Sequence, residues 1–534
     1  MVASVIGGSR GDVRGRRRGP SASWVLAAAL VTVACDGRVT RATGEEENGP
    51  APSAGADEGS AQASAGGGHA AGTSGAQATD GGPAIVAAGG AGGSGEELGS
   101  SGATSGAGGA GASGSPGAGG DGPGAGFPSD DGPGYSVVFP GDGVNDSLYA
   151  AALDAEGRLV VGGGADGTLS LGGEDHAGAV LLWLSPSGEL VQARSFGSAA
   201  YDTQVNGIAP LADGSIIAVG TYRTRVAIGD EVWLPTNGDL GPDMFVMKVA
   251  ANGEVIWARH FGGRGYDWAE SAAVAPNGNV VVSGHVSGAI DFGGGVHDAA
   301  GDTAFLLTLD ADGGHVASQV FSRSSDLDAW PMTSATGMAL GSDGTVWLTG
   351  YASQSYGVGS YLAQLSPTGQ RLTGKPFGDD GYTLANDINA VTGSGPLIVG
   401  YMNGTADFGG GARHTGGSTK LFAARFGPRG EPLWSSLVGD AADYYARASA
   451  VAADRGVFIT GSAYGAEEKP MLVRLAADGT PGEPEVFNAP GRFFAVCTGG
   501  ERSVYLAGQL DGPGDFGFGP VGGQREFIVV RLAR

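Results

Sequence analysis

The chain has 534 residues, of which 105 are glycine, and a formal net charge of −25 at pH 7. Outside the extreme N-terminus it has no lysine- or arginine-rich stripe, so it lacks the charge that neutralises phosphates, and a nucleic-acid partner is not expected. Glycine is far above ordinary usage and is concentrated in the first third, so that third is considered separately from the rest.

The N-terminus has the layout of an export signal. A basic stretch, Arg10 to Arg18, precedes a short apolar core, WVLAAALVTV, which is too short to span a bilayer well. The residues before Cys35, Thr32-Val33-Ala34, resemble the lipobox of bacterial lipoproteins, although Thr32 departs from the usual Leu, Val or Ile. The resemblance implies a signal peptide over residues 1–34 and acylation of Cys35. An ordinary secretory signal is the alternative.

Acylation at Cys35 would anchor the mature chain in a membrane, because several acyl chains bind far more firmly than one. We expect a lipid-anchored protein of the bacterial cell envelope, at the outer membrane or cell surface rather than the inner membrane. Asp36 resembles an inner-membrane retention signal of some bacteria, so anchoring in the inner membrane is the alternative. With Cys35 acylated, Cys497 has no disulfide partner and is interpreted as a small buried hydrophobe.

Residues 35–134 are predicted to be a disordered tether. From about Thr43 to Gly134 the chain is almost wholly Gly, Ala, Ser, Pro and acidic residues, as in GGAGGSGEELGSSGATSGAGG, and cannot bury enough apolar surface to offset the entropy of ordering. A flexible coil of roughly 90 residues has an end-to-end distance of about 50–60 Å. Such a tether would hold a domain clear of a lipid headgroup layer.

Residues 135–534 are predicted to form an all-β domain. Short runs rich in Val, Ile, Leu and Phe alternate with turns that carry Gly, Asp, Asn and Pro. A four-stranded unit recurs, and the glycine that closes its second strand can be followed through seven copies: Gly163, Gly220, Gly284, Gly350, Gly400, Gly461 and Gly508. A spacing of about 47 to 66 residues with four short strands per unit is typical of propeller blades.

The two ends of this domain complement each other. The third strand of the unit occurs seven times, ending with FIVVRLA, whereas the fourth occurs only six times. Ahead of the first unit, YSVVFPGDG has the character of a lone fourth strand. Pairing residues 136–139 beside residues 527–532 would remove an exposed edge and close a seven-bladed β-propeller of four-stranded antiparallel blades. Six or eight blades, or an open β-solenoid, are the alternatives.

The repeated unit also carries a family resemblance. Its pattern of GNVVVSG followed by DFGG, at Asp291 to Gly294, at Asp407 to Gly410 and, shortened, at Asp515 to Gly517, resembles the seven-bladed beta-propeller (SBBP) repeat of bacterial exported proteins. The resemblance covers the whole domain and implies export and the propeller fold. It implies no catalytic residues, because the repeat is a structural signature and its members are largely of unknown function.

Few residues are candidates for a site. Aspartates precede the first strand in four units: Asp146, Asp202, Asp267 and Asp443. If their carboxylates converged, they would hold a hard cation such as Ca²⁺. The alternative is that each aspartate only caps a turn. Aromatic residues in irregular loops suit carbohydrate or protein recognition, or loop packing: Trp233, Trp330, Tyr356, Tyr444 and Tyr445. The sequence has no paired-histidine metal motif, nucleophile elbow or phosphate loop, and we expect no catalytic residue.

These observations predict a non-enzymatic propeller lipoprotein that is anchored in the cell envelope and is a monomer. It would bind or scaffold an extracellular or periplasmic partner, which would be a protein or a carbohydrate. The alternative is a carbohydrate-active enzyme, a polysaccharide lyase or glycosidase, with a site assembled from several blades, because distant carboxylates need no sequence motif. A scaffold of the envelope without a defined ligand is a third interpretation.

Overall fold

The computed structural model describes residues 134–534, except 144–145, 198–202, 229–230, 234–240, 322–330, 355–356, 379, 392–393, 441, 501 and 524. All of them belong to one unit of the chain, Ala107–Arg534. Every helix or strand among them is a β-strand, so the predicted all-β fold is confirmed. Among these residues, no helix is long and apolar enough to cross a membrane. The predicted signal, Cys35 and nearly all of the tether lie outside the described residues.

The first three four-stranded sheets are built from consecutive chain segments. The first contains β2 (Ser147–Leu153), β3 (Leu159–Leu171), β4 (Glu174–Leu184) and β5 (Leu190–Phe196). The second contains β6 (Thr203–Pro210), β7 (Ile216–Tyr222), β10 (Asp243–Val249) and β11 (Val255–Phe261). The third contains β12 (Trp268–Val274), β13 (Val280–Asp291), β14 (Val296–Leu309) and β15 (His315–Val320). In each sheet the strands pair antiparallel in chain order, as expected for repeated hairpins.

A nine-stranded sheet follows, made of two such units joined by a single parallel pairing, Val358 with Tyr382. Its first unit comprises β16 (Met332–Leu340), β17 (Val346–Gln354), β18 (Gly357–Leu365) and β19 (Arg371–Phe377). Its second comprises β20 (Asp380–Val391), β21 (Gly395–Asp407), β22 (Ala412–His414), β23 (Lys420–Phe426) and β24 (Pro432–Val438). Two small hairpins stand apart from the larger sheets: β8 (Val226–Ile228) with β9 (Glu231–Trp233), and β31 (Gly514–Asp515) with β32 (Pro520–Val521).

Two four-stranded sheets complete the described chain. The first contains β25 (Asp443–Val451), β26 (Val457–Tyr464), β27 (Glu468–Leu475) and β28 (Glu485–Val486). The second contains β29 (Gly491–Gly499), β30 (Ser503–Leu510), β33 (Glu526–Ala533) and, from the other end of the domain, β1 (Tyr135–Phe139).

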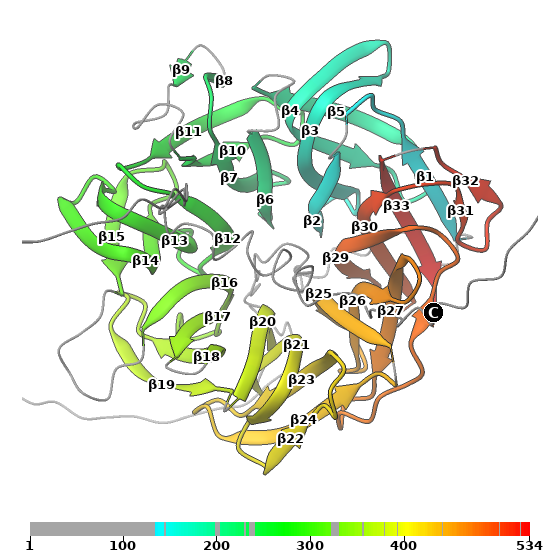
Figure 1. Cartoon of the computed structure of the whole chain (residues 1–534). Coiled ribbons are helices and arrows are strands. Elements are labelled where there is room, and N and C mark those ends of the chain that lie inside the picture. The colour runs from blue at the N-terminus through cyan, green and yellow to red at the C-terminus, as the bar shows by residue number, and fades with distance from the viewer. Residues whose placement is uncertain are drawn as a thin grey trace, which may run out of the picture. The chain divides into compact units, whose positions relative to one another are not determined.

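The predicted partnership between the two ends of the domain is present. β1 pairs antiparallel with β33, with Phe139 opposite Phe527 and Val137 opposite Val529. In Figure 1, β1 lies beside the red β33. Phe139 and Phe527 are both buried in a core that also contains Leu148 of β2, so β1 packs on the first sheet while it hydrogen-bonds to the last strand.

The sheets are arranged around a common centre in a propeller-like manner (Figure 1). The strands nearest that centre, which we call the inner strands, are β2, β6, β12, β16, β20, β25 and β29 (Figure 1). Each inner strand contacts the next along the chain, and β29 contacts β2. The apolar cores lie between neighbouring sheets, as in the cluster that joins Val246 of β10 to Phe305 of β14.

The seven recurrent glycines share one physical cause. A Cβ atom on Gly284 would lie 1.9 Å from the backbone oxygen of Trp268 on the adjacent inner strand. The corresponding distance is between 1.9 and 2.2 Å at all seven positions. The backbones therefore approach too closely for any side chain, and each copy needs glycine.

The DFGG elements are structural turns. The Oδ1 atom of Asp291 accepts hydrogen bonds from the backbone N–H groups of Gly293 and Gly295, at 2.7 and 3.0 Å. Both glycines have positive φ, +98° and +113°, and Phe292 is buried between sheets. Asp407 and Asp515 cap their turns in the same way. This geometry explains the motif without a ligand.

Candidate functional site

Each inner strand carries a β-bulge opposite its recurrent glycine. In β12, Ala269 pairs with Gly284 and Ser271 pairs with Ser283, which leaves Glu270 without a partner across the strand pair. The same shift of register occurs in all seven inner strands. We call the extra residues the bulge residues: Tyr149, Asn206, Glu270, Thr336, Asn386, Arg447 and Phe494.

The bulge residues differ from their neighbours in exposure. The residues on either side of each one are buried, as Ala269 and Ser271 are around Glu270, because they fill the interfaces with adjacent sheets. Six bulge residues are partly exposed, and only Asn206 is buried. A bulge breaks the alternation of a strand and redirects one side chain. Because the inner strands surround a common centre, the bulge residues are grouped around it.

Contacts connect neighbouring bulge residues. Three of them donate a side-chain hydrogen bond to the carbonyl that precedes the next bulge: Asn206 Nδ2 to Ala269 O at 2.9 Å, Thr336 Oγ1 to Ala385 O at 2.8 Å, and Asn386 Nδ2 to Ala446 O at 2.7 Å. The rings of Tyr149 and Phe494 lie 5.1 Å apart. The backbone geometry therefore repeats while the side-chain chemistry changes from strand to strand.

Arg447 is held at its position by an aromatic ring. Its guanidinium carbon lies 5.7 Å from the ring centre of Phe494, a cation–π geometry. Its Nε atom is buried and has no hydrogen-bond partner among the described residues. No ion pair of the described residues involves Arg447. The site therefore contains a cation whose charge is not neutralised by a described carboxylate.

Three tyrosines interact electrostatically with Arg447: Tyr351, Tyr401 and Tyr464. Together with Tyr382 and Tyr445, which pack against them, they form what we call the tyrosine cluster. Ring centres are 6.1 Å apart for Tyr382 and Tyr401, 4.9 Å for Tyr401 and Tyr445, and 5.7 Å for Tyr445 and Tyr464. The hydroxyl of Tyr351 donates to Asn386 Oδ1 at 2.8 Å. Burial raises the pKa of every member, so their hydroxyls stay protonated at neutral pH.

A carboxyl and a histidine meet beside this cluster. Glu270 Oε1 lies 3.8 Å from His285 Nδ1, and Ser334 Oγ lies 3.4 Å from the same nitrogen. A nucleophilic triad needs its hydroxyl and its carboxylate on opposite nitrogens of the ring, so this arrangement is not one. Burial raises the pKa of Glu270 to about 7 and lowers the pKa of His285 to about 4. Both groups are therefore predominantly neutral between these values.

The aspartates predicted as cation ligands serve separate local roles. Each of the three described ones accepts from a backbone N–H: Asp146 from Asp166 at 3.0 Å, Asp267 from Gly263 at 2.6 Å, and Asp443 from Thr419 at 2.6 Å. Burial raises the pKa of Asp146 to about 6 and that of Asp267 to about 7. Asp202 lies outside the described residues. Within the described ranges, no three His, Cys, Asp or Glu side chains are grouped so as to hold a metal ion.

The predicted aromatic residues separate into two kinds. Tyr445 belongs to the tyrosine cluster, whereas its neighbour Tyr444 packs in the core between β23 and β26. Trp233 is buried, stacks on His260 at 4.9 Å and donates from Nε1 to Glu231 Oε2 at 3.0 Å, which is loop packing. Trp330 and Tyr356 lie outside the described residues. Cys497 is buried, as expected, and burial raises the pKa of its thiol to about 12.

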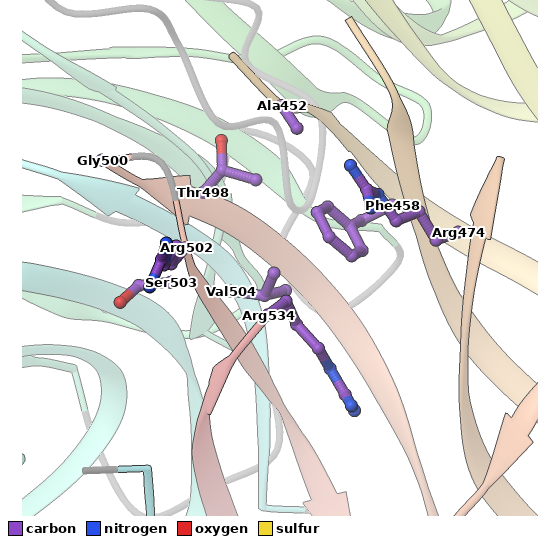
Figure 2. A pocket seen from close by; sticks show the side chains of 9 residues that line it. All are labelled: Ala452, Phe458, Arg474, Thr498, Gly500, Arg502, Ser503, Val504 and Arg534. Carbon is purple, nitrogen blue, oxygen red and sulfur yellow. The ribbon is translucent and has the colours of Figure 1, made fainter. Parts of the chain in front are cut away.

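Two cavities lie away from the bulge residues. Figure 2 shows one of about 30 Å³, lined by Arg474, Arg502 and Arg534 among others. Arg474 is paired with Asp454 and Arg534 with Glu485, so these two charges are already neutralised. The other cavity, of about 290 Å³, lies between turns and is lined by residues that include Pro276, Leu340 and Pro367. Neither cavity brings together a set of reactive side chains.

The bulge residues were missed by the sequence analysis, although a signal for them exists. Inner strands are rich in small residues, and the bulge residue is usually the large or polar one within them, as in AES, AND and ARA. The recurrent glycine marks the bulge from the partner strand. Which side chain leaves the alternation depends on strand register, and register is set by tertiary pairing.

Comparisons with known proteins give no family for this chain. No family model matches it, and no curated protein matches it. Solved structures that are similar to it at low level include the following three. A protein of unknown function from Bacteroides caccae has a TM-score of 0.33 at 10% identity, covering 66% of this chain and 94% of that one. The PQQ-bound aldose sugar dehydrogenase from Streptomyces coelicolor has a TM-score of 0.30 at 12% identity, with coverage of 75% and 98%.

The third structure, Sqt1 from Chaetomium thermophilum, has a TM-score of 0.38 at 10% identity and covers 74% of this chain and 100% of that one. These TM-scores are too low to carry an argument about function.

Proposed function

We propose that this chain is a non-enzymatic binding protein of the bacterial cell envelope, lipid-anchored through Cys35 and built on a closed seven-bladed propeller of the SBBP repeat kind. Seven blades are supported by the seven recurrent glycines, the seven bulged inner strands and the contact of each inner strand with the next. Closure is supported by the pairing of β1 with β33 and by the contact of β29 with β2.

The observation that carries the binding function is the row of bulge residues. Residues that repeat in every sheet, such as the glycines and the DFGG turns, are explained by backbone geometry. The bulge position has the same geometry in every sheet but holds a different side chain in most of them, including the acid Glu270, the cation Arg447 and the aromatics Tyr149 and Phe494. Partly exposed side chains of varied chemistry on a rigid scaffold suit recognition of a partner.

The binding function is tested by changing the bulge residues together. The full chain and a Tyr149→Ser, Glu270→Gln, Arg447→Gln variant would be compared for retention of glycans and of purified envelope components. The control replaces exposed side chains on outer strands, Val191→Ser and Ile256→Ser, which are 53% and 54% exposed. Retention lost only in the bulge variant, with circular dichroism unchanged, supports the proposal. A partner that both variants retain equally contradicts it.

The carbohydrate-active enzyme remains the rival interpretation. A glycosidase needs two carboxyl groups about 5 to 9.5 Å apart across the substrate. Glu270 is the one carboxyl among the seven bulge residues, all of which the structure describes. This composition favours binding over hydrolysis at the centre of the ring.

The anchor is tested separately. Mass spectrometry of the mature protein is expected to find an N-terminal peptide that begins at acylated Cys35. A mature chain that begins at any other residue, or an unmodified Cys35, contradicts the lipoprotein proposal.

A further inference from the structure

We propose that Arg447 binds the carboxylate of a uronate sugar, with the tyrosine cluster and Glu270 contacting the hydroxyls of the sugar ring. This inference rests on the proposed binding function and names the ligand class of the same site. The chain contains 55 acidic residues and only 30 basic ones. With acids in such excess, a partly buried arginine without a paired carboxylate calls for an explanation.

A neighbouring arginine shows how the acids are distributed. Arg492, which precedes the bulge of β29 by two residues, is paired with both Glu468 and Asp511 at 3.3 Å. These carboxylates neutralise Arg492 and leave Arg447 unpaired among the described residues. An unpaired guanidinium with a buried, unsatisfied Nε carries a desolvation cost that an incoming anion would offset.

The geometry around Arg447 is fixed before any ligand binds. The bulge of β25 directs its backbone, and the ring of Phe494 holds its guanidinium face. The planar guanidinium fork matches a carboxylate, which it can bind through two parallel hydrogen bonds. Little conformational entropy would be lost on binding, because the side chain is already restrained.

The surroundings favour a carboxylate carried by a hydroxylated ring. Arg447 interacts electrostatically with the hydroxyls of Tyr351, Tyr401 and Tyr464. These three groups are neutral hydrogen-bonding partners rather than further cations, which suits a singly charged anion better than a phosphate. Tyr464 is 48% exposed, so part of its ring is available to stack on a sugar.

Glu270 supplies the complementary function. It interacts electrostatically with Tyr351, which also interacts with Arg447, so one tyrosine lies within range of both charges. A carboxyl group beside a sugar ring accepts hydrogen bonds from hydroxyls when ionised and also donates one when protonated. A peptide C-terminus also carries a carboxylate, but it would leave these hydroxyl-binding groups without partners.

The test is calorimetric titration of the full chain with galacturonate and its short oligomers, with galactose, with the methyl ester of galacturonate, with an N-acetylated dipeptide and with inorganic phosphate. We expect binding of the free acid and at least tenfold weaker binding of the neutral sugar and the ester. Preference for the dipeptide or for phosphate, or equal binding of acid and ester, overturns the uronate assignment.

A matched pair of variants locates the site. Arg447→Gln is expected to weaken binding of the acid by at least tenfold. Arg474→Gln is the control, because Arg474 also lies over a phenylalanine ring, that of Phe458 at 5.3 Å, but is paired with Asp454. Equal loss in both variants, or loss in neither, contradicts the inference. If Arg447→Gln fails to fold, the difference in affinity between the acid and its methyl ester, measured on the unaltered chain, still tests the uronate assignment.

The two proposals fail separately. If no uronate binds but the triple bulge variant still loses an envelope component, the ligand class is wrong and the binding function stands. If neither experiment detects binding at the bulge residues, both are wrong.

Discussion

At the scale of single residues, two backbones approach each other closely at each recurrent glycine. Gly284 faces the carbonyl oxygen of Trp268, which would lie 1.9 Å from an added Cβ. Gly284→Ala should therefore force β12 and β13 apart and lower the free energy of unfolding by about 1–3 kcal/mol, as overpacking does. The measurement is the midpoint of urea unfolding.

Gly410→Ala is the control for this substitution. Its Cβ would meet nothing within 4 Å, so the midpoint should stay almost unchanged. Equal effects of the two alanines would show that close backbone approach is not the reason for the recurrent glycines.

Glu270 should make stability depend on pH. Burial raises the pKa of Glu270 from 4.5 to about 7, so the folded protein holds this proton more tightly than the unfolded chain. Its contribution is present below pH 4.5 and is lost as the pH rises through 7, by about 3 kcal/mol in all. Glu270→Gln should therefore reduce the drop in unfolding midpoint between pH 5 and pH 8.

The exposed Glu254→Gln is the matched control and should leave that drop unchanged. His285 works in the opposite direction. Burial lowers its pKa from 6.5 to about 4, so its contribution is lost as the pH falls through that range. An unaltered pH profile in Glu270→Gln would show that the carboxyl is solvated rather than buried.

At the scale of strands, β1 takes part in two interfaces at once. Tyr135, Val137 and Phe139 pack toward the first sheet, and Val138 packs in the core shared by β30 and β27. This alternation is the period-two pattern of a strand that packs on both faces. A five-residue strand thus connects the start of the domain to its end.

Phe139→Ala should destabilise the whole domain, because Phe139 is buried in the core with Leu148 and Phe527. The expected loss is about 3 kcal/mol, as for other large-to-small changes in a core. The check is a shift in the midpoint of a single unfolding transition, with the exposed Val191→Ala on β5 as control. An unchanged midpoint for Phe139→Ala would mean that β1 is not an integral strand.

The pairing of β1 could be predicted from sequence because repeats can be counted. The last unit lacks a fourth strand, and the segment before the first unit has the character of a fourth strand without a unit of its own. The bulges were harder to predict, because the large or polar residue in AES or ARA is only a hint of the bulge and the residue that leaves the alternation is set by strand register. Tertiary packing also decided the role of Trp233, which the sequence allowed for binding but which the structure buries against His260. Asp146, Asp267 and Asp443 each accept a hydrogen bond from a backbone N–H group, and which backbone group lies in reach is again decided by tertiary packing.

At the scale of the whole molecule, a ring of sheets shares its stability only if its ends meet. Each inner strand contacts the next, and β29 contacts β2, so the sheet completed by β1 lies between the sheet of β25–β28 and the first sheet, β2–β5. Closure would bury both faces of every sheet and leave no raw edge on β33. It would also hold the bulge residues in fixed positions around one centre, as the proposed site requires.

Hydrogen exchange measured by mass spectrometry on the full chain tests this closure most directly. In the closed ring, the amides of residues 135–139 that hydrogen-bond to β33 are expected to be protected from exchange, as those of residues 527–532 are, since the two strands pair. Exchange of residues 135–139 at the rate of an unstructured chain, with residues 527–532 still protected, would contradict the closed ring.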